Sequence, residues 1–314
     1  MTKKSSVCMG TLVTQRVYGV FAHRAIECCQ RLFESLESEM SVFVPSSDIF
    51  MLNASAGKGP VKISPRSVEV LELAQRVSVL SSGAFDVTAG AFVNLWRTAL
   101  AENRVPDASE IAVTSRLVDY RKLVLDSKHS TAHLKIPGQS VDLGGIAKGY
   151  AARLARETYQ TYGVKSAVLD LGGAVLFVGR RARSSEWVAG IQHPAKERGA
   201  CFACVSVVDK CVVTSGGYER YQLHDGIRYH HIIDPSTGYP SNSDLVSCSI
   251  VSHDPVWADA LSTACFVLGS ERAIHLVESI EDTHLILLTS NNEVYVSPSL
   301  RDSLRLLDAD MRLI

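Results

Sequence analysis

Ser140-Val-Asp-Leu-Gly-Gly-Ile-Ala-Lys-Gly-Tyr150 is the stretch of sequence that does most to decide the fold. Its pattern predicts a strand, a glycine turn and then a helix whose buried side carries Ala151 and Ala155. Gly163 is placed to close that helix. Because the turn is neither G-x-G-x-x-G nor a Walker A sequence, the standard dinucleotide-binding and P-loop folds are not indicated.

The flanking segments predict helices and strands in irregular alternation. Helices are expected along an apolar stripe from Ala22 to Met40, from Ser64-Pro65 to about Ser82-Gly83, from Asp254-Pro255 to Gly269, and over residues 271–279. Strands are expected at 6–17, 205–214, 228–233, 245–251, 284–289 and 293–297. Residues 166–178 are also rich in strand formers, but Gly172-Gly173 indicates that the backbone bends or closely approaches another group there. Without a regular βαβ repeat, we predict an α+β fold with mixed, largely antiparallel sheets and packed helices.

The composition limits the possible classes of function. A chain of 314 residues suits one elaborate domain over 1–314 or two closely packed subdomains, and its abrupt end is compatible with excision from a larger protein. The formal net charge of -1 gives no pull toward nucleic acid. With neither an apolar run of membrane-spanning length nor a signal peptide, we expect a cytoplasmic or other intracellular location without a membrane segment.

The eight cysteines are scattered through the expected helices and strands, which fits free core thiols better than a disulfide framework. Cys201 and Cys204 form a C-x-x-C pair, but no second pair accompanies it and it lies in a strand-like run. A structural role is therefore favoured over a metal or redox site.

Asp259 and Thr263 lie four residues apart in a predicted helix, so their oxygens emerge from the same face one turn apart. Two such hard oxygen ligands suit Mg²⁺, which takes its other ligands from water and phosphate. The alternative is a buried Asp–Thr hydrogen bond that only fixes the helix. Spacing alone does not exclude that alternative.

Two further segments have residue types suited to phosphate chemistry. The glycine turn from Asp142 to Gly149 can bring backbone amides to a phosphate, and Lys148 could neutralise it or be a solvated lysine. His230 and His231 adjoin on a predicted strand, so at most one faces a given site. A neutral imidazole there could accept a proton from a hydroxyl, although a lone histidine is more often structural.

Taken together and in order, the motifs of residues 9 to about 270 resemble the ApbE family of flavin transferases, the FAD:protein FMN transferases. The resemblance is carried by Met9-Gly10-Thr11, Ser41-x-Phe43 with Ser47 and Asn53, GAFDVTAG at 83–90, DLGGIAKGY at 142–150, DLGG at 170–173, TSGGYER at 214–220, HIIDPSTGYP at 231–240 and ADALSTA at 258–264. Several long motifs in the same order make a chance match very improbable.

The resemblance implies a role for each matching position. It implies that Mg²⁺ is bound by Asp259, Thr263 and the backbone carbonyl of Gly145. It also implies an FAD site lined by Met9, Ala84, Phe85, Asp86, Asp142, Lys148 and Ile233. The resemblance further implies that His231 takes a proton from a serine or threonine hydroxyl of an acceptor flavoprotein. The hydroxyl would then attack the riboflavin-side phosphorus of FAD, and AMP would leave.

The sequence also departs from the pattern of the family. Many relatives are exported lipoproteins, and no such signal is seen here. Ser82-Gly83-Ala84 matches the end of the acceptor signature but lacks its preceding acidic residue, so self-modification is not expected. Two alternatives stay open: an FAD pyrophosphatase that uses water as nucleophile and gives FMN and AMP, and a flavin-binding module without activity.

Overall fold

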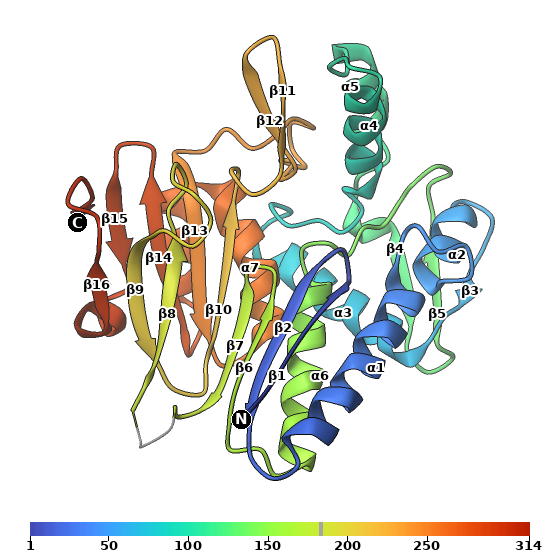
Figure 1. The fold of residues 1–314 in the computed structure, drawn as a ribbon. Helices are drawn as coiled ribbons and strands as arrows, with labels where there is room; N and C mark the ends of the chain where they lie inside the picture. Colours follow the sequence, from blue (N-terminus) through green and yellow to red (C-terminus); the bar gives the residue numbers. More distant parts are fainter. Residues whose placement is uncertain (182–184) are drawn as a thin grey trace. The chain divides into compact units, whose positions relative to one another are not determined.

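The computed structural model describes residues 1–181 and 185–314, and the chain divides into two compact units (Figure 1). Unit 1 comprises Met1–Leu36, Lys148–Gly216 and Ser243–Ile314. Unit 2 comprises Glu37–Ala147 and Gly217–Asn242.

Unit 1 is built on a nine-stranded sheet of order β1-β2-β6-β7-β10-β13-β14-β15-β17. Its strands are β1 (Thr2–Cys8), β2 (Thr11–Tyr18), β6 (Ser166–Leu171), β7 (Ala174–Gly179), β10 (Cys211–Gly216), β13 (Leu245–Ser252), β14 (Thr283–Thr289), β15 (Glu293–Val296) and β17 (Arg312–Leu313). Neighbouring strands are antiparallel except for β15 and β17, which are parallel.

Helices cover one face of this sheet, and a smaller sheet covers the other (Figure 1). The helices are α1 (Ala22–Met40), whose last turn belongs to unit 2, α6 (Ala147–Thr161), which begins one residue before unit 1, α7 (Pro255–Leu268) and α8 (Ser270–Glu278). The small sheet consists of β8 (Trp187–Gln192), β9 (Cys201–Val207) and β16 (Leu304–Leu306). The short helix η3 (Pro298–Ser303) directly precedes β16 in the chain. The Tyr159 hydroxyl of α6 donates to Gln15 of β2 over 2.8 Å, which fixes α6 on the sheet.

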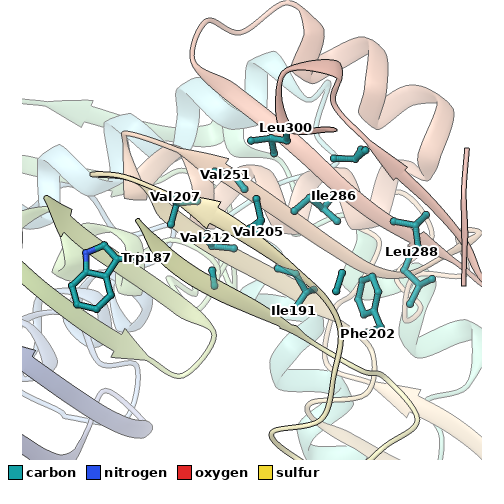
Figure 2. Packing of buried hydrophobic residues seen from close by; sticks show 14 of the residues in the cluster. Trp187, Ile191, Phe202, Val205, Val207, Val212, Val251, Ile286, Leu288 and Leu300 are labelled. Atoms are coloured by element: carbon teal, nitrogen blue, oxygen red, sulfur yellow. The ribbon is translucent and has the colours of Figure 1, made fainter. Parts of the chain in front are cut away.

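The two sheets enclose a continuous apolar core (Figure 2). Phe202 from the small sheet and Val212, Val251 and Ile286 from the large sheet are almost completely buried in it. Alternate residues of the large sheet point to this core, and those between them point to the helices.

Unit 2 combines helices with short antiparallel strands. It contains α2 (Asp48–Ala54), β3 (Val61–Lys62), α3 (Pro65–Leu80), α4 (Gly90–Ala101), α5 (Ala108–Ser115), η1 (Tyr120–Lys122), β4 (Leu123–Asp126), β5 (Thr131–Leu134) and the hairpin of β11 (Tyr221–His224) and β12 (Ile227–His230). Phe92, Trp96, Ile111 and Ile233 form a buried cluster. Trp96 Nε1 donates to the Gly238 carbonyl over 2.7 Å, which ties the turn after β12 to α4.

The predicted α+β class with largely antiparallel sheets is confirmed. The predicted helix starts at Ser64-Pro65 and Asp254-Pro255 are also confirmed, because both Ser64 and Asp254 accept hydrogen bonds from the first turn of their helix. Within the described residues, all eight cysteines are free thiols. No described helix is long and apolar enough to span a bilayer.

Three strand predictions were wrong in detail, whereas the bend expected at Gly172-Gly173 is confirmed between β6 and β7. Residues 6–17 and 205–214 each contain two strands, because turns interrupt their apolar patterns at Met9-Gly10 and Asp209. The expected strand before the Asp142 turn is only an isolated bridge between Ala89 and Ser140. Its residues are extended and buried, but they have no strand neighbour to pair with along their length.

Candidate functional site

The buried carboxylate of Asp259 joins α7 to the start of α6. The residue is only 2% exposed. One carboxylate oxygen accepts from the Gly149 backbone N–H at 2.8 Å, and the other lies 3.3 Å from Lys148 Nζ. A carboxylate at the first turn of a helix is favoured by the partial positive charge of its free N–H groups. The Asp259 carboxylate is therefore bound by one backbone amide and one ammonium group.

Gly149 permits this contact because it has no side chain. A Cβ atom at this position would lie 2.2 Å from the Pro255 carbonyl oxygen and 2.7 Å from Asp259 Cβ. Such distances are far below van der Waals contact, so α6 and α7 approach closely only at a glycine. The role of Gly149 was missed in the sequence, although its motif was quoted.

Thr263 lies one turn beyond Asp259 on α7 and is half-buried. Its Oγ1 lies 3.4 Å from the Oγ atom of Ser215, near the end of β10. The described hydrogen bonds of the Asp259 side chain run to α6. The alternative of a mutual Asp–Thr hydrogen bond is therefore not the arrangement seen.

Gly145 precedes the first turn of α6, which begins at Ala147. In a helix that continued upstream, the Gly149 N–H would donate to the Gly145 carbonyl four residues earlier. It donates to Asp259 instead. The Gly145 carbonyl thus lies outside the helical hydrogen-bond ladder of α6.

Two of the predicted FAD segments lie together in unit 2. The Asp142 N–H donates to the Val87 carbonyl at 2.9 Å, and Ala89 forms a parallel bridge with Ser140. The Asp142 carboxylate accepts from the Gly144 N–H at 2.7 Å, which closes the glycine turn. The structure therefore brings the 83–90 loop and the 142–145 turn side by side.

Asp86 shapes the 83–90 loop from within. Its carboxylate accepts from the Thr88 N–H and hydroxyl, both at 2.7 Å, and from the Tyr120 N–H at 3.0 Å. Burial raises the pKa of this carboxyl, and the three hydrogen bonds oppose that shift. Phe85 is 5% exposed, so its ring is part of the interior, whereas Ala84 is half-buried.

The two adjacent histidines have different surroundings. His230 Nε2 faces the Ser241 carbonyl at 3.0 Å, and its Nδ1 accepts from the Ile232 N–H at 3.3 Å. Burial lowers the pKa of His230, and the hydrogen bond to the Ser241 carbonyl opposes that shift. His231 is exposed, and its Nδ1 lies 3.1 Å from the Arg220 carbonyl. Since a carbonyl only accepts, Nδ1 carries the proton and the neutral ring has its lone pair on Nε2.

The remaining two predicted residues can offer mainly backbone groups. The Ile233 side chain is buried in the cluster with Phe92 and Trp96. Ile233 forms an isolated antiparallel bridge with Pro240, and the residues on either side of these two make the hydrogen bonds of the bridge. The N–H and C=O groups of Ile233 therefore point away from Pro240. Met9, in unit 1, has a φ of +52 in the turn between β1 and β2, a conformation that costs a non-glycine residue roughly 1–3 kcal/mol.

The described structure thus groups the predicted residues within each unit. Lys148, Asp259 and Thr263 belong to unit 1, as does Met9 at its hairpin turn. The 84–86 segment, Asp142, Gly145, His231 and Ile233 belong to unit 2. Among the described residues, no three His, Cys, Asp or Glu side chains form a metal-binding cluster, and the predicted ligand set contains only one such side chain.

The sequence matches the ApbE family over residues 9–287. The chain belongs to the ApbE family. An FAD:protein FMN transferase of Treponema pallidum is 35% identical over 323 residues, covering 98% of this chain and 89% of that protein. One from Klebsiella pneumoniae is 32% identical over 313 residues, covering 99% of this chain and 96% of that protein.

The solved structures agree with this ApbE assignment. The crystal structure of the ApbE protein from Thermotoga maritima matches with a TM-score of 0.86 at 28% identity, covering 95% of this chain and 97% of that one. The flavin transferase ApbE from Vibrio cholerae matches with a TM-score of 0.83 at 26% identity, covering 96% and 98%. The predicted family is confirmed, and with it an enzyme of the flavin transferase class.

We predict that Gly149→Ala lowers the free energy of unfolding by roughly 1–3 kcal/mol, because the added methyl group forces α7 away from α6. Urea unfolding followed by circular dichroism measures this change. Thr161→Ala, at an exposed position of the same helix, is the control and should stay within about 0.5 kcal/mol of wild type. Equal stability of Gly149→Ala and wild type would contradict the tight helix contact.

Proposed function

We propose that this ApbE-family enzyme transfers the FMN half of FAD to a serine or threonine hydroxyl of an acceptor flavoprotein, in a Mg²⁺-dependent reaction that releases AMP. The observation that carries the proposal is the hydrogen bond between the buried Asp259 carboxylate and the Gly149 N–H in the first turn of α6. Because of this bond, the Gly145 carbonyl before α6 lies outside the hydrogen bonds of the helix. The names of two relatives, FAD:protein FMN transferase, support the transfer of FMN from FAD to a protein.

The residues present fit a magnesium ion. The proposed ligands are Asp259, Thr263 and the Gly145 carbonyl, a set of hard oxygens with one negative charge. When bound, Mg²⁺ would neutralise charge on the diphosphate of FAD and so assist attack at phosphorus. The Lys148 ammonium group lies 3.3 Å from the Asp259 carboxylate. Because like charges repel, a cation bound to Asp259 would favour movement of this ammonium group toward the diphosphate.

His231 is proposed as the general base. The Arg220 carbonyl holds its Nδ1 proton, so Nε2 can take the proton from the acceptor hydroxyl. The hydroxyl oxygen then forms a bond to the riboflavin-side phosphorus of FAD. The bond from that phosphorus to the bridging oxygen breaks, and AMP departs with the electron pair. His230 is excluded from this role because both of its ring nitrogens are used in structural contacts.

The other positions of the family motifs are proposed to hold FAD largely through the backbone. Phe85 and Ile233 have buried side chains. The Phe85 N–H already donates to Ser81 Oγ at 3.1 Å, so its carbonyl is the group proposed to meet the ligand. The carboxylates of Asp86 and Asp142 fix the adjoining loops by accepting from the N–H groups of Thr88 and Gly144. Ala84 and Met9 complete the proposed set, and Lys148 supplies positive charge.

The direct test of this function is mass spectrometry of a candidate acceptor flavoprotein after incubation with the protein, FAD and Mg²⁺. We expect an added FMN mass on a serine or threonine and an equal amount of AMP. Steady AMP release from FAD without acceptor would instead indicate a pyrophosphatase. FAD binding without turnover, with any acceptor, would indicate a flavin-binding module.

We predict that His231→Gln lowers kcat by roughly 10²–10⁴-fold while FAD affinity is retained, because glutamine can still donate to the Arg220 carbonyl but cannot take the proton. Stopped-time assays of acceptor labelling and equilibrium FAD titration measure the two quantities. His129→Gln changes an exposed histidine elsewhere in unit 2 and should leave both unchanged. Normal turnover in His231→Gln would rule out the assignment of the base.

We predict that Asp259→Asn, like Asp259→Ala, abolishes the Mg²⁺-dependent activity. Asparagine keeps an oxygen for the Gly149 N–H and removes only the charge, so the fold should remain intact. Activity measured against Mg²⁺ concentration, together with a thermal unfolding curve, checks both statements. If Asp259→Asn kept full activity at the same Mg²⁺ concentration, the metal assignment would be lost.

A further inference from the structure

Four oxygen atoms of unit 1 form a chain from Thr263 back to the backbone of α7. Ser262 Oγ lies 2.8 Å from the Asp259 carbonyl oxygen, Ser215 Oγ lies 2.7 Å from Ser262 Oγ, and Thr263 Oγ1 lies 3.4 Å from Ser215 Oγ. Ser262 is completely buried, so its hydroxyl cannot turn to water. Ser215 belongs to the 214–220 motif, whose residues had no assigned role.

The direction of each hydroxyl proton follows from the fixed end of the chain. The Asp259 carbonyl can only accept, so Ser262 donates to it. Ser262 Oγ must then accept from Ser215, since two lone pairs facing each other over 2.7 Å would repel. The Ser215 proton is thereby committed, and Ser215 can only accept from Thr263.

We infer that Ser215 is a positioning residue that turns the Thr263 hydroxyl proton away from the metal and leaves the oxygen lone pairs of Thr263 for the cation. This inference rests on the proposed function, in which Thr263 is a Mg²⁺ ligand. A neutral hydroxyl ligates a cation only when its O–H bond points elsewhere and finds an acceptor. Ser215 supplies that acceptor within the described structure.

The test is Mn²⁺ titration of the full chain, with and without FAD, followed by the electron paramagnetic resonance signal of free Mn²⁺ and by competition with Mg²⁺. We expect Ser215→Ala to weaken binding by roughly tenfold, because the Thr263 proton loses its acceptor. Ser215→Thr keeps the hydroxyl and should restore binding close to the wild-type value.

A matched control lies on the opposite face of the same strands. Thr214 Oγ1 and Ser249 Oγ are 2.7 Å apart, so Ser249→Ala also removes a buried hydroxyl pair between β10 and β13. It should leave Mn²⁺ affinity unchanged. In a Thr263→Val background, Ser215→Ala should cause no further loss, because the hydroxyl it orients is already gone.

The outcomes separate this inference from the proposed function. If the wild type binds Mn²⁺ and Ser215→Ala binds it with the same affinity, only the role of Ser215 is overturned. Equal weakening by Ser215→Ala in the wild-type and Thr263→Val backgrounds would also overturn it, since the effect would then be structural. Absence of Mn²⁺ binding by the wild type, with and without FAD, would overturn the metal site and this inference with it.

Discussion

The hydrogen bond from the Gly149 N–H to the Asp259 carboxylate is the contact on which the candidate site depends. A buried charge is costly unless it is paired and hydrogen-bonded, and here a helix-start amide and the Lys148 ammonium group meet that requirement. The same bond diverts the Gly149 N–H from the Gly145 carbonyl. One interaction therefore fixes the carboxylate, requires a glycine in α6, and frees a backbone oxygen.

Local sequence signals predicted the starts of α3 and α7 because each start carries its own hydrogen-bonding group, whereas α4, which begins without a side-chain cap, was missed. Ser64 and Asp254 accept from the first turns of α3 and α7 whatever the rest of the chain does. Strand boundaries were harder to predict. Met9 and Asp209 adopt left-handed backbone conformations within apolar runs, so sharp turns occur where the pattern alone indicates continuous strands.

The residues of the site could be predicted from sequence motifs, but the contacts between them could not. Asp259 and Gly149 are far apart in sequence, and nothing local in α7 indicates that its carboxylate meets a backbone amide of α6. The histidine pair shows the same limit. Alternation on a strand separates the two rings, but only the structure shows that His230 faces the Ser241 carbonyl and His231 the Arg220 carbonyl.

The division of both units into separate segments has a kinetic consequence. Strand β2 pairs with β6 across the whole of the first unit 2 segment, so the large sheet cannot be completed until residues distant along the chain have met. The entropy of closing such a long loop is lost before the contacts between its ends can stabilise the chain. Topologies with many such non-local contacts therefore fold slowly. Newly made chains would therefore expose the edge of β2 until α6 and β6 have emerged from the ribosome.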